Sequence, residues 1–336
     1  MPINAIFSFL TYPKRHQADD APISGTAIPL TDDKLCKMLR DIFDTASSDC
    51  PIPIMFTSNG DKQENAVRDE LLALLAKPDV ATASPLATRL QNATSGTSGM
   101  GLLFICLGPD GEHTRIVISR FPADEGVVAE RTVNKLTVSF VEQVFLKSSF
   151  SYKAATYITN GKANQLWSGH VVDKQINHGS KAVADYWIVD FLHSEFSTTA
   201  AAGTKRLAQA LRAVMAATSD LDIKREITSA VHLAGNLPRK AMTIADFCEN
   251  FNLSEGTKKA IVAKVNPSRL VHEKFRFDAV EFSRHIAYKQ IELNNGAVLT
   301  APADKFDECF RETKRREEHT FTTTGVIVDE RLRKTK

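Results

Sequence analysis

The chain has 336 residues, of which 43% are hydrophobic and 24% are charged. This composition is that of a globular protein, and the length corresponds to about two domains. No run approaches the roughly 18 uncharged apolar residues that a membrane-spanning helix requires, so we expect no association with a membrane. The first residues lack the basic start and the small-residue cleavage site of a signal peptide, and they predict a strand instead.

The cysteines predict a reducing compartment. They are odd in number, far apart in the sequence, and form no CxxC pair. Disulfide frameworks use an even number of cysteines, and zinc sites use closely spaced pairs. We therefore expect buried, reduced thiols in a cytoplasmic protein. The five positions are Cys36, Cys50, Cys106, Cys248 and Cys309.

The net charge of +2 conceals an asymmetry along the chain. Residues 1–130 carry 11 lysines and arginines against 17 aspartates and glutamates, whereas residues 131–336 carry 31 against 23. A polyanion such as nucleic acid would therefore meet the second part, and the acidic first part is where a protein partner would bind. A solvated surface that binds no polyanion is the alternative interpretation.

Strand and helix patterns alternate at the start of the chain. Residues 4–12 and 51–58 are apolar stretches bounded by turn residues, which predicts two strands. Between them, residues 31–47 begin with a capping sequence and repeat apolar residues at helical spacing. The same pattern predicts helices at residues 64–77 and 84–93.

Strand patterns dominate the next segment. Two apolar stretches joined by a Pro-Asp-Gly turn over residues 101–121 predict a β-hairpin. Further strands are predicted within residues 135–146 and 152–169. Because these strands come in adjacent pairs, we predict an α/β first domain, residues 1–175, with a mainly antiparallel sheet.

The pattern becomes helical near residue 180. Apolar residues at helical spacing predict three helices, at residues 180–196, 203–218 and 220–236. After Pro267 the period returns to two, which predicts strands within residues 273–283 and 285–302, followed by a basic-ended helix at 303–318. The second domain, residues 176–336, is thus predicted to be helical with a small C-terminal antiparallel β unit. The fold class of the whole chain is α+β.

Two further helices meet within residues 243–265 at the spacing of a helix-turn-helix. Asn252 stands where the chain would turn through a left-handed residue, a conformation that asparagine tolerates. Leu253 would seal the corner, and Ser254 would cap the second helix. On the inner side we expect apolar contacts from Phe247, Cys248, Phe251, Ile261 and Val262. Two core helices joined by an ordinary turn are the alternative.

The expected contacts with DNA are lysines and arginines of the second part. Several lie on the second helix of this corner, where a DNA-reading helix presents its donors. Lysine neutralises phosphate but reads bases less specifically than a bidentate arginine, so weak sequence preference is expected. The predicted contacts are Lys205, Arg206, Arg239, Lys240, Lys258, Lys259, Lys264, Lys314, Arg315 and Arg316.

Catalytic and metal-binding motifs are absent from the sequence. The nine histidines are scattered and form no HxH, HExxH or HxxxH. His193, one helical turn from Asp190, is interpreted as a structural histidine. Asp173 and Lys174 are interpreted as a surface pair, without the acidic cluster that a magnesium-dependent nuclease needs. We predict no catalytic residue, no metal and no cofactor; a nucleic-acid enzyme without a recognisable motif is an alternative.

Three stretches of the second part resemble a known family. "SKAVADYWIVDFLHSEF" contains a Val-Ala-Asp-aromatic-aromatic helix followed by Asp-Phe-Leu. The helices after it and "TIADFCENF" match the family in order and spacing. Residues 275–316 contain a Phe-Asp-Ala strand, two more strands, a proline-containing loop and a basic-ended helix. Over residues 180–318 the chain therefore resembles the bacterial 37-kDa nucleoid-associated protein family.

The resemblance implies a cytoplasmic, nucleoid protein that associates with double-stranded DNA as a homodimer and has no catalytic residues. The family's glycine-rich lead into the terminal strands is replaced here by "PSRLVHEKF". The divergent, acidic first part is expected of a specialised member, for example one that acts in antiviral (antiphage) defence. We predict a non-enzymatic, weakly sequence-specific DNA-binding protein; an adaptor or scaffold that acts on other proteins is the alternative.

Overall fold

The chain folds into two compact units, Met1–Thr199 and Ala200–Lys336. A computed structural model describes residues 2–12, 23–58, 64–94, 99–132, 135–145, 147, 150–162, 165–176, 186–235, 237, 240–286, 288–302, 305–316 and 318–326, with the backbone only for residues 125–143. Within these ranges no helix is both long enough and apolar enough to cross a membrane. A large sheet, helices and small hairpins together form the predicted α+β fold.

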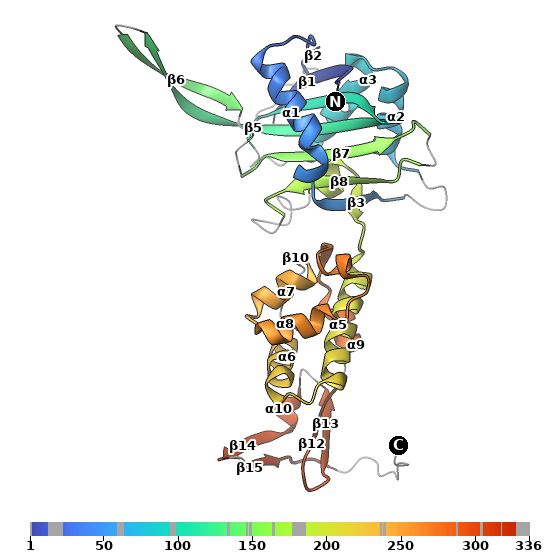
Figure 1. Cartoon of the computed structure of the whole chain (residues 1–336), viewed down its shortest axis with the longest axis vertical. Helices are drawn as coiled ribbons and strands as arrows, with labels where there is room; N and C mark the ends of the chain where they lie inside the picture. Colours follow the sequence, from blue (N-terminus) through green and yellow to red (C-terminus); the bar gives the residue numbers. More distant parts are fainter. Residues whose placement is uncertain are drawn as a thin grey trace. The chain divides into compact units, whose positions relative to one another are not determined.

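One antiparallel sheet forms the centre of the first unit (Figure 1). Its strands follow the order β2-β1-β4-β5-β7-β8-β3-β9, and β6 pairs with β5. All pairs between the described strands are antiparallel, as predicted. The strands are β1 (Ala5–Thr11), β2 (Gly25–Ala27), β3 (Ile52–Phe56), β4 (Gly101–Asp110), β5 (His113–Thr132), β6 (Lys135–Phe145), β7 (Lys153–Thr159), β8 (Ser168–Asp173) and β9 (Ser194–Phe196).

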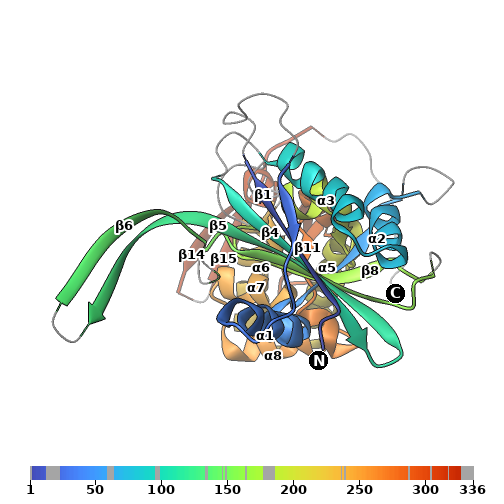
Figure 2. The same ribbon diagram turned by 90° about the horizontal axis from the view of Figure 1, so that it is seen from above.

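Helices cover both faces of this sheet (Figure 2). Helix α1 (Lys34–Asp49) begins where Asp33 accepts a hydrogen bond from the Cys36 N–H at 2.7 Å. Its apolar stripe packs on one face, in a core shared with β1, β4 and β5. Helices α2 (Ala66–Ala76) and α3 (Val80–Ala93) lie on the other face. All three predicted helices of this region are therefore confirmed.

The predicted hairpin is β4 and β5, and its turn lies slightly later than expected. Asp110 pairs with His113, which leaves Gly111 and Glu112 as the loop instead of residues 109–111. Gly111 has a φ of 62°, in the left-handed region that glycine enters without a steric penalty. The glycine, more than the proline before it, therefore fixes the register.

The predicted helix at residues 180–196 is confirmed only for the first half of its described part and is wrong at its end. Residues Tyr186–Phe191 form a short π-helical segment, and β9 follows and pairs with β3. His193, between the two, has a φ of 44°, which ends the helical path. Residues 180–185 lie outside the described residues. The apolar content of the stretch was interpreted correctly, since Trp187 is fully buried.

Because of β9, the boundary between the two units lies later in the sequence than predicted. We predicted a boundary between residues 175 and 176, but the first unit extends to Thr199. Because β9 supplies hydrogen-bond partners to the edge of β3, the segment before it belongs to the first unit. The family resemblance that begins at residue 180 therefore starts inside that unit.

The second unit begins with a helical core. The predicted helices at 203–218 and 220–236 are confirmed as α5 (Ala200–Ala217) and α6 (Leu221–Ala234). Gly203 lets α5 approach the short strand β11, because a Cβ at this position would lie 2.1 Å from Cγ of Phe275. The remaining elements of the core are β10 (Ala241–Met242), α7 (Ile244–Asn250), α8 (Glu255–Val262), β11 (Phe275–Arg276) and α9 (Ala279–His285).

Small hairpins follow the helical core. The predicted strands at 285–302 are β12 (Tyr288–Glu292) and β13 (Val298–Pro302), joined at Gly296, whose φ is 83°. The strand predicted at 273–283 is wrong beyond β11, because Asp278 caps helix α9 there.

The C-terminal helix predicted at 303–318 is also wrong. Its described part contains the four-residue helix α10 (Phe306–Cys309), followed by a hairpin of β14 (Arg311–Arg315) and β15 (Glu318–Thr322). After Phe310 the segment has no apolar residues with which a helix could pack. All five residues of β14 are exposed, and the strand pairs in register with Glu318–Thr322.

The cysteines are free thiols, and all but one are buried. Cys36, Cys50, Cys106 and Cys248 are buried as predicted. Cys309 is exposed, which corrects the prediction, because it ends the short helix α10 at the surface.

Candidate nucleic-acid interface

The corner between α7 and α8, residues 243–265, has the turn and the cap that the sequence predicts for a helix-turn-helix. Thr243 and Asp246 cap α7 reciprocally, since each backbone N–H donates to the other side chain at 2.9 Å. Asn252 has a φ of 48°, the left-handed conformation that the turn requires. Ser254 then caps α8 and accepts a hydrogen bond from the Thr257 N–H at 3.3 Å. Asn252 and Ser254 are the turn and cap positions predicted from the sequence, whereas the reciprocal cap of α7 was not predicted.

The inner side of the corner is apolar. Phe247, Cys248, Leu253 and Ile261 are all buried, and α8 packs against α5, α6 and α7. Phe251 is partly buried and packs on the same core. Val262, which we expected in the core, is 37% exposed, since the residue after Ile261 lies beyond the buried stripe of α8. Apolar packing on the inner side therefore stabilises the corner, and the outer side of α8 is exposed to solvent.

Lys258 does not offer an unpaired charge on this outer side. Its Nζ lies 2.7 Å from Oε1 of Glu249 and 3.1 Å from Oε1 of Glu255. These two hydrogen bonds raise the pKa of Lys258 above its ordinary value. Two carboxylates around one ammonium group leave this point of the corner negative. Lys258 is therefore the weakest of the predicted contacts on α8.

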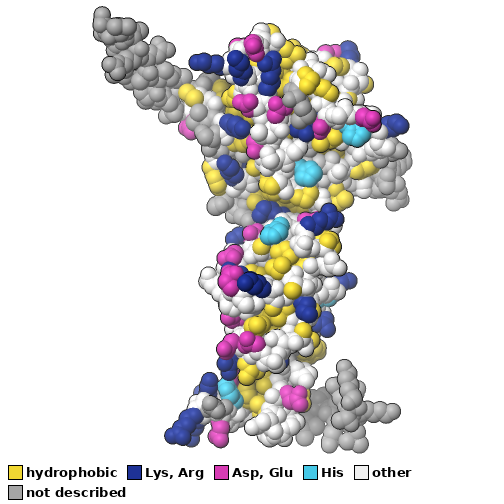
Figure 3. All heavy atoms as spheres, in the orientation of Figure 1, with side chains coloured by type: hydrophobic (Ala, Val, Ile, Leu, Met, Phe, Trp, Pro, Cys, Tyr) yellow, Lys and Arg dark blue, Asp and Glu magenta, His cyan; other side chains and the backbone are white. Residues whose placement is uncertain are grey.

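A third carboxylate lies at the start of α8. Glu226, on α6, accepts a hydrogen bond from the backbone N–H of Ser254 at 2.9 Å. Hydrogen bonds from the Thr257 side chain and the Ser254 N–H lower the pKa of Glu226. Because the N-terminus of a helix is a natural site for phosphate, this carboxylate occupies a position that a phosphate group would take. Figure 3 shows acidic side chains along one side of α7 and α8.

Lys259 and Lys264 are the other cations of the corner. Both are exposed, Lys259 on α8 and Lys264 in the turn that follows. Neither has an acidic partner among the described residues. They are therefore the best-placed phosphate contacts of the corner.

The remaining helical candidates are more dispersed. On α5, Lys205 is exposed, whereas Arg206 is half-buried with a buried Nη1 that has no hydrogen-bond partner among the described residues. Lys240 is half-buried directly before β10. Arg239 lies outside the described residues. The structure thus does not gather these residues around the corner as one patch.

Lys314, Arg315 and Arg316 belong to a different element. They lie on β14 and in its turn, and all three are exposed. Figure 1 places this hairpin at the end of the second unit opposite β10 and α7, and Figure 3 shows basic side chains gathered over it. The predicted contacts therefore fall into a helical group and a hairpin group.

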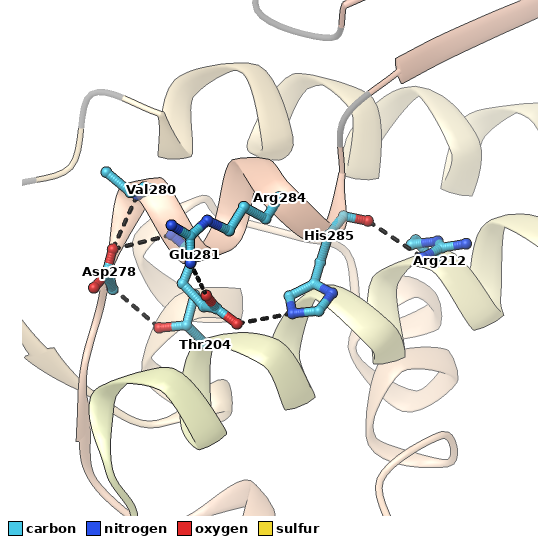
Figure 4. Close-up of polar contacts among 7 residues, drawn as sticks. All are labelled: Thr204, Arg212, Asp278, Val280, Glu281, Arg284 and His285. Carbon is cyan, nitrogen blue, oxygen red and sulfur yellow. Dashed lines mark hydrogen bonds and ion pairs between the residues drawn. The ribbon is translucent and has the colours of Figure 1, made fainter.

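Cations around α9 are already engaged (Figure 4). Arg284 pairs with Glu281 at 3.3 Å, and Glu281 also receives a hydrogen bond from His285 at 2.9 Å. Arg212 donates to the His285 carbonyl at 3.3 Å. This polar network holds α9 on α5 and is not a second cationic surface.

The first unit contains a buried ion pair that the sequence did not indicate. Lys153 on β7 pairs with Asp173, its register partner on β8, and neither side chain has exposed area. Burial lowers the pKa of Lys153. The interpretation of Asp173 and Lys174 as a surface pair is therefore wrong: only Lys174 is exposed.

His193 has a structural position, as predicted. Its carbonyl accepts hydrogen bonds at 2.9 Å from the Thr57 N–H, the Thr57 hydroxyl and the Asn65 amide. Its Nε2 lies 3.2 Å from Nη1 of Arg89, which is itself paired with Glu70. Burial and the Arg89 charge lower the pKa of His193. No group of three or more metal-ligating side chains occurs in the described part of the chain.

No protein-family model matches the chain, and no curated protein matches it. The candidate interface therefore rests on geometry and charge.

Proposed function

We propose that the second unit binds double-stranded DNA without catalysing a reaction, mainly through phosphate contacts. The observation that supports the proposal is the α7–α8 corner, in which a left-handed Asn252 and a capped α8 stand at the positions expected of a helix-turn-helix. Lys259 and Lys264 are exposed cations on the helix and turn that this geometry presents. Binding through the corner places these ammonium groups against the DNA backbone.

The charge of the two units supports this division of roles. Residues 200–336 carry 24 lysines and arginines against 18 acidic residues, and residues 1–199 carry 18 against 22. DNA binding therefore belongs to the second unit. The acids at the corner make the binding weak, because they lie close to the phosphate-facing lysines.

Sequence preference is expected to be low. The exposed positions of α8 and its C-cap include Gly256, Val262 and Ala263 beside Lys259, and none of these provides a bidentate donor for a base edge. Affinity then depends on released counterions and falls steeply with salt.

The β14–β15 hairpin provides a second cationic element. Arg311, Lys314, Arg315 and Arg316 are all exposed on it. A two-stranded ribbon of this kind fits the major groove of B-DNA. We assign it an accessory role, since Glu312 and Glu318 are interleaved with its cations.

A salt series of DNA binding tests the proposal. In fluorescence anisotropy with a duplex of mixed sequence, Lys259→Glu together with Lys264→Glu should weaken binding and lower the salt slope by about 2, the value for two phosphate contacts. The matched control is Lys34→Glu with Lys37→Glu, which makes the same charge change on exposed positions of α1. The control should bind like the parent.

Two results would contradict the proposal. Unchanged affinity in the Lys259→Glu, Lys264→Glu variant would show that the corner does not contact DNA and has only a structural role. A parent protein that binds no duplex at about 50 mM salt would favour the adaptor alternative. Incubation with plasmid and Mg²⁺ checks the non-enzymatic part, for which we expect intact DNA.

A further inference from the structure

The β14–β15 hairpin divides its side chains between two unlike faces. Residues that stand opposite each other in an antiparallel pair lie on the same face, so the register places Phe321 with Glu312 and His319 with Lys314. We call this side of the hairpin the ring face. The other face is wholly polar and exposed, and it consists of the pairs Arg311–Thr322, Thr313–Thr320 and Arg315–Glu318.

The two rings of the ring face lie almost parallel on β15. Their centroids are 6.5 Å apart and their planes differ by 14°. Glu312 forms a hydrogen bond with Nδ1 of His319, which fixes the plane of the imidazole. Both rings are half-buried, and neither belongs to the helical core of the second unit as far as the structure describes it. The two rings are therefore a feature of the hairpin that packing of that core does not explain.

Unpaired cations surround these rings. Glu312 and Glu318 lie on the same hairpin, but Glu312 is held by His319. In the described part of the chain no carboxylate forms an ion pair with the basic residues of β14 and its turn, which differ in this respect from Lys258. These exposed cations are Arg311, Lys314, Arg315 and Arg316. Their charges are available to a polyanion beside the rings.

Rings beside unpaired cations distinguish between forms of nucleic acid. In a duplex each base is stacked between its neighbours, so a protein meets base edges and phosphates. In a single strand the base faces are free to stack on aromatic side chains, while basic residues follow the backbone. On a duplex the hairpin can use its cations alone, which is the accessory role described above. Its rings require unpaired bases.

We propose that the ring face binds single-stranded DNA or RNA. Unpaired bases stack on Phe321 and His319, and the cations of β14 and its turn contact the adjoining phosphates. Glu312 is a positioning residue, because it holds the His319 ring parallel to that of Phe321. This site lies on a different element from the α7–α8 corner, so single-strand binding does not depend on duplex binding there.

Two substitutions at one position test the stacking. In fluorescence anisotropy of the full chain with a labelled oligothymidylate, Phe321→Leu removes the ring but keeps an apolar side chain, and it should weaken binding about tenfold. Phe321→Trp retains a ring and should bind at least as tightly as the parent. The salt slope should be the same in all three proteins, because no cation is lost. The matched control is Tyr288→Leu, which removes a 67% exposed ring from the β12–β13 hairpin and should bind like the parent.

A charge variant tests the phosphate contacts. Lys314→Gln with Arg316→Gln should lower the salt slope for oligothymidylate by about 1.4, the value for two phosphates of a single strand. The same titrations with an oligouridylate compare RNA with DNA. Binding of either strand supports the proposal, and the tighter of the two identifies the sugar that the site prefers.

Three results would overturn the proposal. A parent that binds neither oligonucleotide at about 50 mM salt has no single-strand site. A Phe321→Leu protein that binds like the parent shows that the ring does not stack on bases. Equal losses in Phe321→Leu and Phe321→Trp show that Phe321 supports the hairpin fold alone. Failure of duplex binding at the corner gives a different result, because the parent would then bind the oligonucleotides and not the duplex.

Discussion

Each unit contains a lysine held by carboxylates, and the two lysines have opposite surroundings. The side chains of Lys153 and Asp173 are 0% exposed, whereas Lys258 retains 21% and its partners Glu249 and Glu255 retain 70% and 77%. Removing a charge from water costs several kcal/mol, while an exposed ion pair contributes little to stability. The Lys153–Asp173 pair therefore affects the stability of the first unit when one partner is removed. The ion pairs of Lys258 mainly affect the surface charge of the second unit.

Breaking the buried pair should have the largest effect. Asp173→Ala leaves the Lys153 ammonium buried without a counter-charge, so we expect a loss of about 3–5 kcal/mol in unfolding free energy. Urea unfolding followed by tryptophan fluorescence measures this loss in the first unit alone, because both tryptophans, Trp167 and Trp187, lie there.

A double variant is the control for this measurement. Lys153→Met with Asp173→Leu replaces both charges by apolar groups, and it should recover most of the lost stability. Equal losses in the single and double variants would show that packing at these positions, and not the uncompensated charge, determines the stability.

Neutralising the partners of the exposed lysine should affect binding and not stability. Glu249→Gln with Glu255→Gln should leave the urea unfolding curve of the helical circular dichroism, to which the helices of both units contribute, at its parental position. The Lys258 ammonium then becomes available to phosphate, so DNA affinity should rise and the salt slope should increase by about 1.

The matched control neutralises two exposed acids that form ion pairs in the first unit. Asp32→Asn with Asp69→Asn removes the partners of Arg40 and Arg68, and DNA affinity should not change. A lower urea midpoint in the Glu249→Gln, Glu255→Gln protein would show that the exposed pair supports the fold of the corner after all.

Local signals in the sequence predicted the backbone of the corner but not its charge. Asn252 and Ser254 act on their immediate neighbours, so their roles follow from residue type and position. The contact of Glu226 with the Ser254 N–H joins residues 28 positions apart, which no local pattern contains. The position of the candidate interface was therefore predictable, and its electrostatics were not.

The same limit explains the errors elsewhere. Asp173 stands beside Lys174 in the sequence, but the register of β7 and β8 places it against Lys153. The stretch at 186–196 has helical apolar spacing, yet its last residues form a strand because they pair with the open edge of β3. In both cases the sheet supplies a partner that is distant in sequence. Hydrophobic periodicity indicated the burial of Trp187 and Phe191 correctly but not their backbone conformation, and it gave no sign that the charged Asp173 is buried.

The smallest expected effect concerns the caps of the helices in acid. Asp79 caps α3 in the first unit and accepts the Thr82 N–H at 2.8 Å, a hydrogen bond that lowers the pKa of Asp79 from 3.8 to about 2. Its contribution to stability is complete above pH 3.8 and is lost as the pH falls toward 2. At the corner, Ser254 caps α8 with a hydroxyl group that does not titrate in this range.

The variant Asp79→Asn keeps a side chain that can cap the helix but removes the carboxylate charge. Asparagine caps a helix about as well as aspartate, so the variant should match the parent at pH 5 apart from the small loss of the Lys77 ion pair. Between pH 5 and pH 3 its urea midpoint, followed by tryptophan fluorescence, should fall less than that of the parent, because no carboxylate at position 79 takes up a proton. Identical declines would show that the acid sensitivity of the first unit arises from other carboxylates.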